Sequence, residues 1–473
     1  AELSWKDING NDKNSKSHDR FNPDGYTKGN GFKYGSYNAQ TKEIKWDIGF
    51  NYNNRTIKDP SIVDVLENNQ KLIPDSIEIH HMELTGGADG YKLGALVSPD
   101  EYTVENPTKD NKNTLTIHFK NEIKTAYHIS FKTSLAGEEI NKRYDNYAKL
   151  KDGSETIANI HGAFEIKNGG SGVTKKAKQN DKYIDWSVSI NASQSTIENA
   201  VVTDDPTDNQ ILDEKSFHLY GTTVAVDGTL TKDTTNELKE GKDYKLKITT
   251  DNNTGKQQFT IEFLHTIDRA YILEYRSLIN ADNNEKVSNK AKITGNSLKL
   301  TETEKIEEIV VKVSSGSGGG SATKGRGNLQ IKKVDNADPN KILSGVVFTL
   351  FDRTGTTAIR TITTDENGIA QFNNLKRDEY LLREMKTLDG YVISKELKAG
   401  KLVKLGAEET TTYTLKNEKF VGKVVLTKTD AHNKEKLKNA VFSLLDQNHN
   451  VIPEHKELIT NDKGQITVDN LKP

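Results

Sequence analysis

The sequence predicts an all-β chain made of several β-sandwich domains in tandem. Short runs of alternating apolar and polar residues recur along it, such as 45–50 and 259–263, and clusters of Asn, Asp, Gly and Lys separate them. No amphipathic helix longer than a turn or two is evident. The chain has 473 residues, of which only 33% are hydrophobic. This length suggests about three or four domains, and this composition indicates thin cores with much surface, or partial disorder.

Charge and cysteine content exclude several kinds of function. The 66 Lys and Arg residues nearly balance the 68 Asp and Glu residues, so the chain lacks the concentrated positive charge that a nucleic-acid surface needs. The absence of cysteine excludes disulfides, thiolate metal sites and thiol nucleophiles. No apolar run approaches the roughly 20 residues that span a bilayer, and no signal peptide or C-terminal anchor is evident. We therefore expect a fragment of a longer protein, without membrane insertion.

The first 313 residues contain two diverged copies of one domain. The first copy spans 1–166 and the second 167–313, and their strand motifs follow the same order. The residues that align between the copies are Trp46 with Trp186, Asp64 with Asp204, Tyr127 with Tyr271 and Asn146 with Asn289. The first copy also carries a polar insertion before its tryptophan. We expect both tryptophans to lie in the cores of their sandwiches.

A second repeat family follows a Gly/Ser segment. Residues 314–327 read SSGSGGGSATKGRG and are expected to form a flexible linker. The segment 329–352 then matches 424–446 in its pattern of apolar and charged residues. We therefore expect a complete smaller domain over 328–419 and a partial copy of it over 420–473.

Each of the three complete domains carries a lysine near its first strand, an acid in mid-domain and an asparagine near its last strand. The sets are Lys6, Asp64 and Asn146; Lys176, or alternatively Lys175, with Asp204 and Asn289; and Lys333, Glu384 and Asn417. Burial disfavours the ammonium form of lysine, and the neutral amine can attack the asparagine side-chain carbonyl. A buried carboxyl group stays protonated, polarises that carbonyl and passes a proton to the leaving ammonia. The product is a Lys–Asn isopeptide bond, formed once per domain, so we expect self-processing and not an enzyme with turnover.

Each of these residues has a simpler interpretation when taken alone. A strand lysine normally faces solvent, and an Asp or Asn beside a turn normally stabilises that turn. The ordered triplet in three domains favours the reaction over these interpretations. Neither a metal nor a cofactor is expected. His80 and His81 lie at successive strand positions and face opposite sides, and the DINGND stretch from Asp7 lacks the central glycine and closing glutamate of a calcium-binding loop.

Residues 328–419 resemble a Cna B-type domain. The motifs that carry the resemblance are IKKVD, LSGVVFTLFD, TTDENG, NNLKRDEYLLREMKTLDGY and LKNEK. The resemblance implies that Lys333 is the nucleophile, Glu384 the catalytic acid and Asn417 the acceptor of an isopeptide bond. The sequence departs from the family pattern at KRDEY and TLDGY, and neither departure includes the triad.

Residues 1–313 resemble the tandem Ig-like ligand-binding domains of the Cna-type collagen adhesins. The shared motifs are W-x-[IV]-x-[IFV]-N, [IV]-[VT]-D and N-x-A, and each occurs in both copies. The resemblance implies two larger Ig-like sandwiches ahead of the smaller B-type domains. It also implies that Asp64 and Asp204 are catalytic acids and that Asn146 and Asn289 are acceptors.

The resemblance implies a secreted, cell-wall-anchored Gram-positive adhesin, expected to be a monomer. Its first two domains would bind a host extracellular-matrix protein, with collagen the family expectation, and its B-type domains would form a stalk. One alternative is a structural stalk or pilus-type subunit without a ligand of its own. Another is an adhesin for a different host protein such as fibrinogen, bound as a peptide along a strand edge. A wall-associated hydrolase has no support in the sequence.

Overall fold

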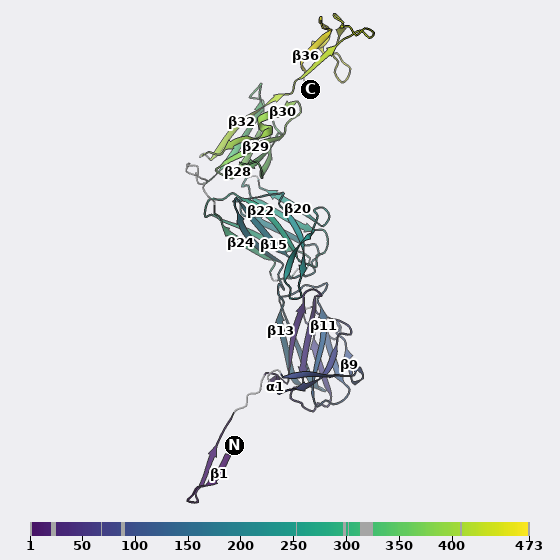
Figure 1. Cartoon of the computed structure of the whole chain (residues 1–473), viewed down its shortest axis with the longest axis vertical. Helices are drawn as coiled ribbons and strands as arrows, with labels where there is room; N and C mark the ends of the chain where they lie inside the picture. The colour runs from purple at the N-terminus through teal and green to yellow at the C-terminus, as the bar shows by residue number, and fades with distance from the viewer. Residues whose placement is uncertain are drawn as a thin grey trace.

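The structure of the protein is a computed structural model dominated by strands. It describes residues 2–19, 25–67, 69–86, 90–251, 253–296, 299–300, 302–312, 325–406 and 409–471. Separate β-sandwiches follow one another from the N-terminal to the C-terminal end (Figure 1). The helical elements in these ranges are α1 (Gly25–Gly29), α2 (Lys395–Ala399) and the 3-10 turns η1 (Pro99–Glu101) and η2 (Pro453–His455). The predicted all-β class is confirmed, and no helix in the described ranges is long and apolar enough to cross a membrane.

The first sandwich packs two sheets around a core that includes Trp46. One sheet has the order β3 (Gly31–Asn38), β4 (Glu43–Phe50), β11 (Ala126–Ser134), β7 (Glu78–Leu84) and β8 (Tyr91–Leu96), with β6 (Lys71–Leu72) also paired to β11. The other has the order β13 (Glu155–Glu165), β12 (Arg143–Asp152), β5 (Pro60–Val65), β10 (Thr114–Phe119) and β9 (Tyr102–Glu105). The Trp46 indole is fully buried, and its Nε1 donates to Oε1 of Gln70 at 2.8 Å.

The second sandwich repeats this strand order. One sheet runs β14 (Val173–Asn180), β15 (Tyr183–Ile190), β22 (Tyr271–Ile279), β18 (His218–Val224) and β19 (Leu230–Glu237), with β17 (Gln210–Leu212) paired to β22. The other runs β24 (Glu304–Val310), β23 (Lys286–Thr294), β16 (Val201–Pro206), β21 (Gln257–Phe263) and β20 (Tyr244–Thr250). Residues of β15 alternate between buried and half-buried, as expected for a strand with one face on the core. Trp186 is buried on this strand, so both tryptophans lie in cores, as predicted.

The third sandwich is smaller and brings its first and last long strands together. One sheet has the order β28 (Ile369–Lys376), β25 (Arg326–Asp335), β32 (Thr410–Lys419) and β30 (Tyr391–Val392). The other has the order β27 (Ala358–Thr363), β26 (Val347–Asp352), β29 (Glu379–Lys386) and β31 (Lys401–Lys404). Strands β25 and β32 are parallel neighbours, with Asp335 opposite Asn417. This arrangement places the two ends of the domain's chain on adjacent strands.

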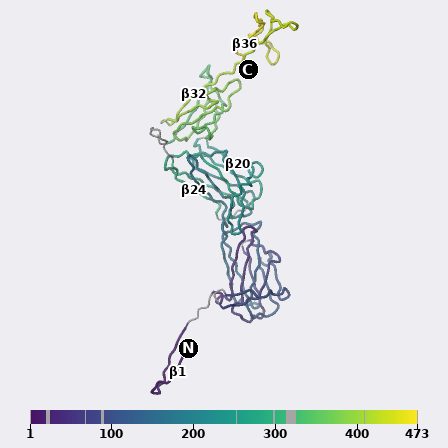
Figure 2. The backbone as a smooth tube through the Cα atoms, in the orientation of Figure 1, coloured from purple at the N-terminus to yellow at the C-terminus, as the bar shows by residue number. Residues whose placement is uncertain are grey.

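Two small sheets lie at the ends of the described chain. At the N-terminal end β1 (Glu2–Lys6) and β2 (Asp12–Lys16) form a hairpin apart from the first sandwich (Figure 2). At the C-terminal end β33 (Gly422–Thr427) pairs with β36 (Gln465–Leu471), and β34 (Val441–Phe442) pairs with β35 (Leu458–Ile459). All residues of the hairpin strands are exposed, so the hairpin has no core of its own.

The first and second sandwiches are in direct contact. The hydrogen bonds between them include Ala39 N to Val226 O at 3.0 Å, Gln40 Nε2 to Val224 O at 3.0 Å, Ile140 N to Ser195 Oγ at 2.8 Å and Thr196 N to Glu138 O at 3.0 Å. Two of these bonds, Ala39 N to Val226 O and Thr196 N to Glu138 O, join backbone groups on both sides. The junction near residue 166 is therefore closed by specific contacts.

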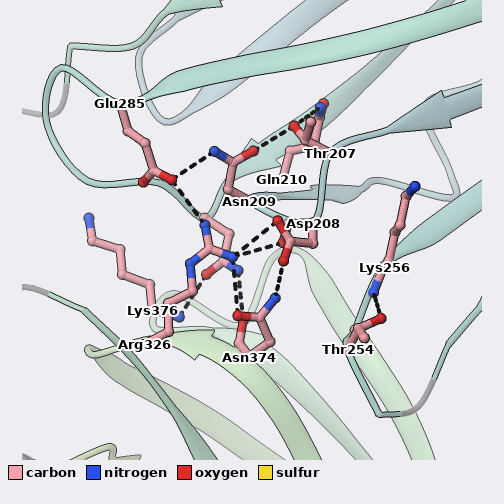
Figure 3. A network of polar contacts seen from close by, with 12 residues as sticks. Thr207, Asp208, Asn209, Gln210, Thr254, Lys256, Glu285, Arg326, Asn374 and Lys376 are labelled. Atoms are coloured by element: carbon pink, nitrogen blue, oxygen red, sulfur yellow. Dashed lines mark hydrogen bonds and ion pairs between the residues drawn. The ribbon is translucent and has the colours of Figure 1, made fainter.

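The second and third sandwiches also pack against each other. Arg326 donates to the Asp208 carbonyl oxygen at 3.1 Å, its guanidinium lies 3.5 Å from Glu285, and Nδ2 of Asn374 donates to Oδ2 of Asp208 at 2.8 Å (Figure 3). Two apolar residues of the second domain, Ile211 and Leu278, belong to the core of the third. A linker is expected over 314–327. Residues 314–324 of it lie outside the described residues, and Arg326 belongs to β25.

Candidate cross-linking centres

The third domain brings Lys333, Glu384 and Asn417 together in its core. They lie on β25, β29 and β32, and all three are buried. Nζ of Lys333 lies 2.8 Å from Oε2 of Glu384 and 2.8 Å from Oδ1 of Asn417. Nδ2 of Asn417 donates to the other oxygen of Glu384 and, at 2.7 Å, to Oγ1 of Thr387. The amine thus lies beside the amide it would attack, and the acid contacts both reaction partners.

Burial favours the reactive form of this lysine. Removal from water lowers the pKa of Lys333, against the opposing effect of Glu384. The side chain lies in an apolar setting, with Nζ 5.5 Å from the centroid of the Phe348 ring. A neutral amine is the form that can attack a carbonyl carbon.

The sequence-based assignment of Lys6 to the first centre is wrong. Lys6 ends β1 in the isolated hairpin, where 72% of its side chain is exposed and it pairs with Asp12 at 3.8 Å. The first strand of the sandwich is β3, so the polar segment that seemed to follow the first strand precedes it. The lysine that β3 places beside Asp64 is Lys33.

Lys33 and Asp64 form a fully buried pair, in which Nζ donates to Oδ2. The amine lies 5.2 Å from the centroid of the Trp46 ring, which helps to shield it from water. Burial lowers the pKa of Lys33 to about 8, although Asp64 acts to raise it. Burial also raises the pKa of Asp64, although Lys33 acts to lower it. Both shifts favour a neutral amine beside a protonated carboxyl group.

The third member of the first centre, Asn146, is completely buried on β12. Strand β12 pairs with β5, which carries Asp64. Among the described residues, none forms a hydrogen bond with Nδ2 or Oδ1 of Asn146, or with Oδ1 of Asp64. A buried polar group without a partner costs about 1–3 kcal/mol. A bond between Lys33 and Asn146 would eliminate the unpaired amide nitrogen.

In the second domain the lysine at the centre is Lys175, so the choice of Lys176 is wrong. Side chains alternate along β14, so Lys175 faces the core while Lys176 is exposed on the other face. Nζ of Lys175 donates to Oδ2 of Asp204, and both side chains are fully buried. Burial lowers the pKa of Lys175 to about 8 and raises that of Asp204. Asn289 is also buried.

Sequence reasoning missed Lys33, and it also missed Tyr275 of the second centre. The tyrosine hydroxyl contacts Lys175 at 2.8 Å and Asn289 at 2.6 Å. A signal for Lys33 was present, because it lies 13 residues before its tryptophan and Lys175 lies 11 residues before the matching one. No comparable signal marked Tyr275, since a tyrosine on a core strand is ordinarily a packing residue.

Two family models match the chain. The one described as a collagen binding domain matches residues 28–160 and 171–304, which is more than half of the chain. The one described as a prealbumin-like fold domain matches 327–419 and 422–473. No curated protein matches the chain.

Several solved structures are similar at low identity. The Bacillus anthracis TIE protein is 16% identical over 91% of this chain, which spans 64% of that protein, with a TM-score of 0.26. BcpA, the major pilin subunit of Bacillus cereus, is 15% identical, with coverages of 76% and 100% and a TM-score of 0.22. ACE19, the collagen binding subdomain of the Enterococcus faecalis surface protein ACE, is 17% identical, with coverages of 30% and 97% and a TM-score of 0.22. Scores this low support no functional argument.

The assignment therefore depends on the family models, which fit the two larger sandwiches and the smaller ones that follow. The chain belongs to the collagen-binding-domain family and has the Cna-type arrangement, in which two such domains precede prealbumin-like domains.

Proposed function

We propose that the chain is part of a Gram-positive adhesin, anchored to the cell wall, whose first two domains bind collagen in the host extracellular matrix. The observation that carries this proposal is the match of the collagen binding domain model to both larger sandwiches. The prealbumin-like domains would hold this binding region away from the cell surface. A pilus-type structural subunit is the second candidate, favoured by the direct packing of the second domain against the third.

The shape of the ligand argues for two domains acting together. Collagen is a rod of three extended chains with shallow surface relief. One sandwich face would touch such a rod over less area than the roughly 1,000 Å² of a specific interface. Two domains that enclose the rod would reach this area. Enclosure at the junction requires the hydrogen bonds between Ala39 and Val226 and between Gln40 and Val224 to open.

A fragment-binding assay tests the adhesin proposal. Fragments 1–313, 1–166, 167–313 and 328–419 are passed over immobilised triple-helical collagen, with fibrinogen as the control surface. We expect 1–313 to bind, each single sandwich to bind far more weakly, and 328–419 not to bind. Equal binding by one sandwich alone would remove the enclosure mechanism. If 1–313 does not bind collagen, the structural subunit without a ligand of its own is favoured. If 1–313 binds only fibrinogen, the ligand is fibrinogen and not collagen.

We also propose that three isopeptide bonds form, Lys33–Asn146, Lys175–Asn289 and Lys333–Asn417. In each case a buried lysine contacts a buried acid in the same core as the asparagine. Treated like a disulfide that closes a loop of about a hundred residues, each bond would stabilise its domain by roughly 5 kcal/mol. Intact-mass measurement is expected to find three ammonia molecules missing from the chain, and the full unreacted mass would refute the bonds.

A further inference from the structure

The hydroxyl of Tyr275 lies in the middle of the second centre. It accepts hydrogen bonds from Nζ of Lys175 at 2.8 Å and from Nδ2 of Asn289 at 2.6 Å. It donates a hydrogen bond to Oδ1 of Asp204 at 3.0 Å. A tyrosine hydroxyl has one donor and two acceptor sites, so its whole hydrogen-bonding capacity is used on the three reacting side chains.

The first domain provides the same scaffold without this hydroxyl. Phe131 pairs with Trp46 on the neighbouring strand, as Tyr275 pairs with Trp186, so the two rings occupy matching places. In the second domain the hydroxyl contacts the acid Oδ1 and the asparagine Nδ2. In the first domain these two atoms, on Asp64 and Asn146, have no hydrogen-bond partner among the described residues. The hydroxyl therefore accounts for the difference between the two centres.

We propose that Tyr275 is a catalytic residue of the second centre, which relays a proton from Asp204 to the leaving nitrogen of Asn289. The inference rests on the proposed isopeptide reaction and adds a role that the lysine, acid and asparagine do not supply. The two oxygens of Asp204 face different partners, since Oδ2 accepts from Lys175 and Oδ1 accepts from Tyr275. The acid can thus take up a proton on one side while it gives one up on the other.

Neutral Asp204 carries its proton on Oδ1 in the reactive state, so the hydrogen bond with Tyr275 then runs from Oδ1 to the Tyr275 oxygen and the hydroxyl proton turns toward Nδ2 of Asn289. The neutral amine of Lys175 attacks Cγ of Asn289, and the Nζ–Cγ bond forms. The attacking nitrogen gives a proton to Oδ2 of Asp204, while the Oδ1 proton passes to the Tyr275 oxygen. The hydroxyl proton of Tyr275 passes to Nδ2, the Cγ–Nδ2 bond breaks and ammonia leaves. Asp204 and Tyr275 end in the protonation states in which they began.

The surroundings of Tyr275 suit a relay. Burial, and then the nearby Asp204, raise the pKa of Tyr275 well above its ordinary value, so the hydroxyl keeps its proton before and after the transfer. The ring is stacked against Phe217, with the centroids 4.9 Å apart, and packs edge-on against Phe259. These contacts hold the buried hydroxyl in place.

The test uses the full chain with Tyr275→Phe, the residue type that the first domain already carries at this place. Native and variant chains are collected unfolded from inclusion bodies and refolded by dilution. Tryptophan fluorescence follows folding, and mass spectrometry of proteolytic peptides follows each cross-link over time. We expect the Lys175–Asn289 bond to form at least about tenfold more slowly in the variant, as for loss of a general acid–base group. The Lys33–Asn146 and Lys333–Asn417 bonds in the same molecules serve as internal controls and are expected to keep their native rates.

Different results would refute the role of Tyr275 and the isopeptide bonds on which that role depends. A native rate of Lys175–Asn289 bond formation in the variant would overturn the role of Tyr275 and leave the isopeptide proposal standing. Folding that slows in step with cross-linking would also overturn it, because the hydroxyl would then act through folding. Absence of all three bonds from the native chain would refute the isopeptide proposal itself. The reciprocal Phe131→Tyr variant is expected to speed the first bond, and an unchanged rate in a folded variant would count against the relay.

Discussion

Gly162 lies directly against the backbone of Lys33, on the strand next to Asn146. A Cβ atom added at Gly162 would lie 2.6 Å from the Lys33 carbonyl oxygen and 3.0 Å from its Cγ. The same glycine pairs with Asn146 across β12 and β13. Only a residue without a side chain allows β3 to approach this closely, so Gly162 helps to set the position of the nucleophile.

Replacing Gly162 by alanine is expected to displace Lys33 and to slow the first cross-link. Because the clash is with backbone atoms, the strand must shift, at a cost of about 1–3 kcal/mol in the free energy of unfolding. The measurement combines thermal unfolding with peptide mass analysis of the Lys33–Asn146 bond. Gly29→Ala is the matched control, since a Cβ there meets nothing within 4 Å. Normal cross-linking at the native melting temperature in Gly162→Ala would contradict the prediction.

Replacing Lys33 by methionine is expected to abolish the first cross-link, whereas Lys6→Met leaves it intact. Methionine keeps much of the apolar length of lysine but has no amine to attack Asn146. Loss of the bond should lower the stability of the first domain by roughly 5 kcal/mol. Peptide mapping of both variants distinguishes the two lysines. A cross-link to Asn146 that survives in Lys33→Met would show that another residue is the nucleophile.

Replacing Glu384 by glutamine should leave the third domain folded but not cross-linked. Glutamine matches the shape of the acid but cannot pass a proton to the leaving nitrogen of Asn417. We expect the variant to lose no ammonia, whereas the native domain loses one. The variant should also melt at a lower temperature and be cleaved faster by protease. Mass spectrometry of fragment 328–419 provides the measurement. Formation of the Lys333–Asn417 bond at the native rate would show that Glu384 has no catalytic part.

The rate of the first cross-link should depend on pH with a bell shape. The reactive pair of Lys33 and Asp64 holds one proton in total. Above about pH 8, the lowered pKa of Lys33, the pair loses this proton and the acid can no longer donate. Below the raised pKa of Asp64 the pair gains a second proton and the amine is no longer a nucleophile. Refolding across pH 4 to 10, with mass analysis at fixed times, tests this, and a rate that keeps rising above pH 9 would contradict it.

Replacing Arg326 by alanine is expected to loosen the contact between the second and third domains. The variant loses a hydrogen bond to Asp208 and an ion pair with Glu285, both in the second domain, which together should cost about 1–3 kcal/mol. Solution scattering should then show a broader distribution of interdomain distances. Arg143→Ala is the control, because Arg143 lies in the first domain, forms its ion pair with Asp145 of the same domain and has 53% of its side chain exposed. An unchanged scattering curve for Arg326→Ala would mean that apolar packing alone fixes the joint.

The sequence predicted the repeats better than the exact membership of the centres. Motifs with fixed spacing identified Glu384 and Asn417, and the duplication matched Asp64 with Asp204. The sequence points to Lys6 and not Lys33 because an insertion disturbs the spacing at the start of the first copy, and the hairpin that contains Lys6 packs on no core. The choice between Lys175 and Lys176 depends on strand parity, which a single residue of register reverses. The proposed role of Tyr275 depends on which strands lie next to each other in the folded domain, and no local sequence pattern indicates this.

The parallel pairing of β25 with β32 determines how the third domain responds to a pulling force. Force applied along the chain enters at Arg326, runs along β25 to Lys333, crosses the proposed bond to Asn417 and leaves at Lys419. With this bond in place, the chain between the two residues, which are 84 positions apart, would carry no load and the domain could not lengthen.

The two larger sandwiches differ in this respect. The acceptors Asn146 and Asn289 lie on β12 and β23, and one further strand, β13 or β24, follows each before the chain leaves the domain. Each of these last strands lies outside the loop that the proposed bond would close, and is held by hydrogen bonds and packing. Under tension the first two domains can therefore each release one strand and lengthen, while the third transmits the force without extending.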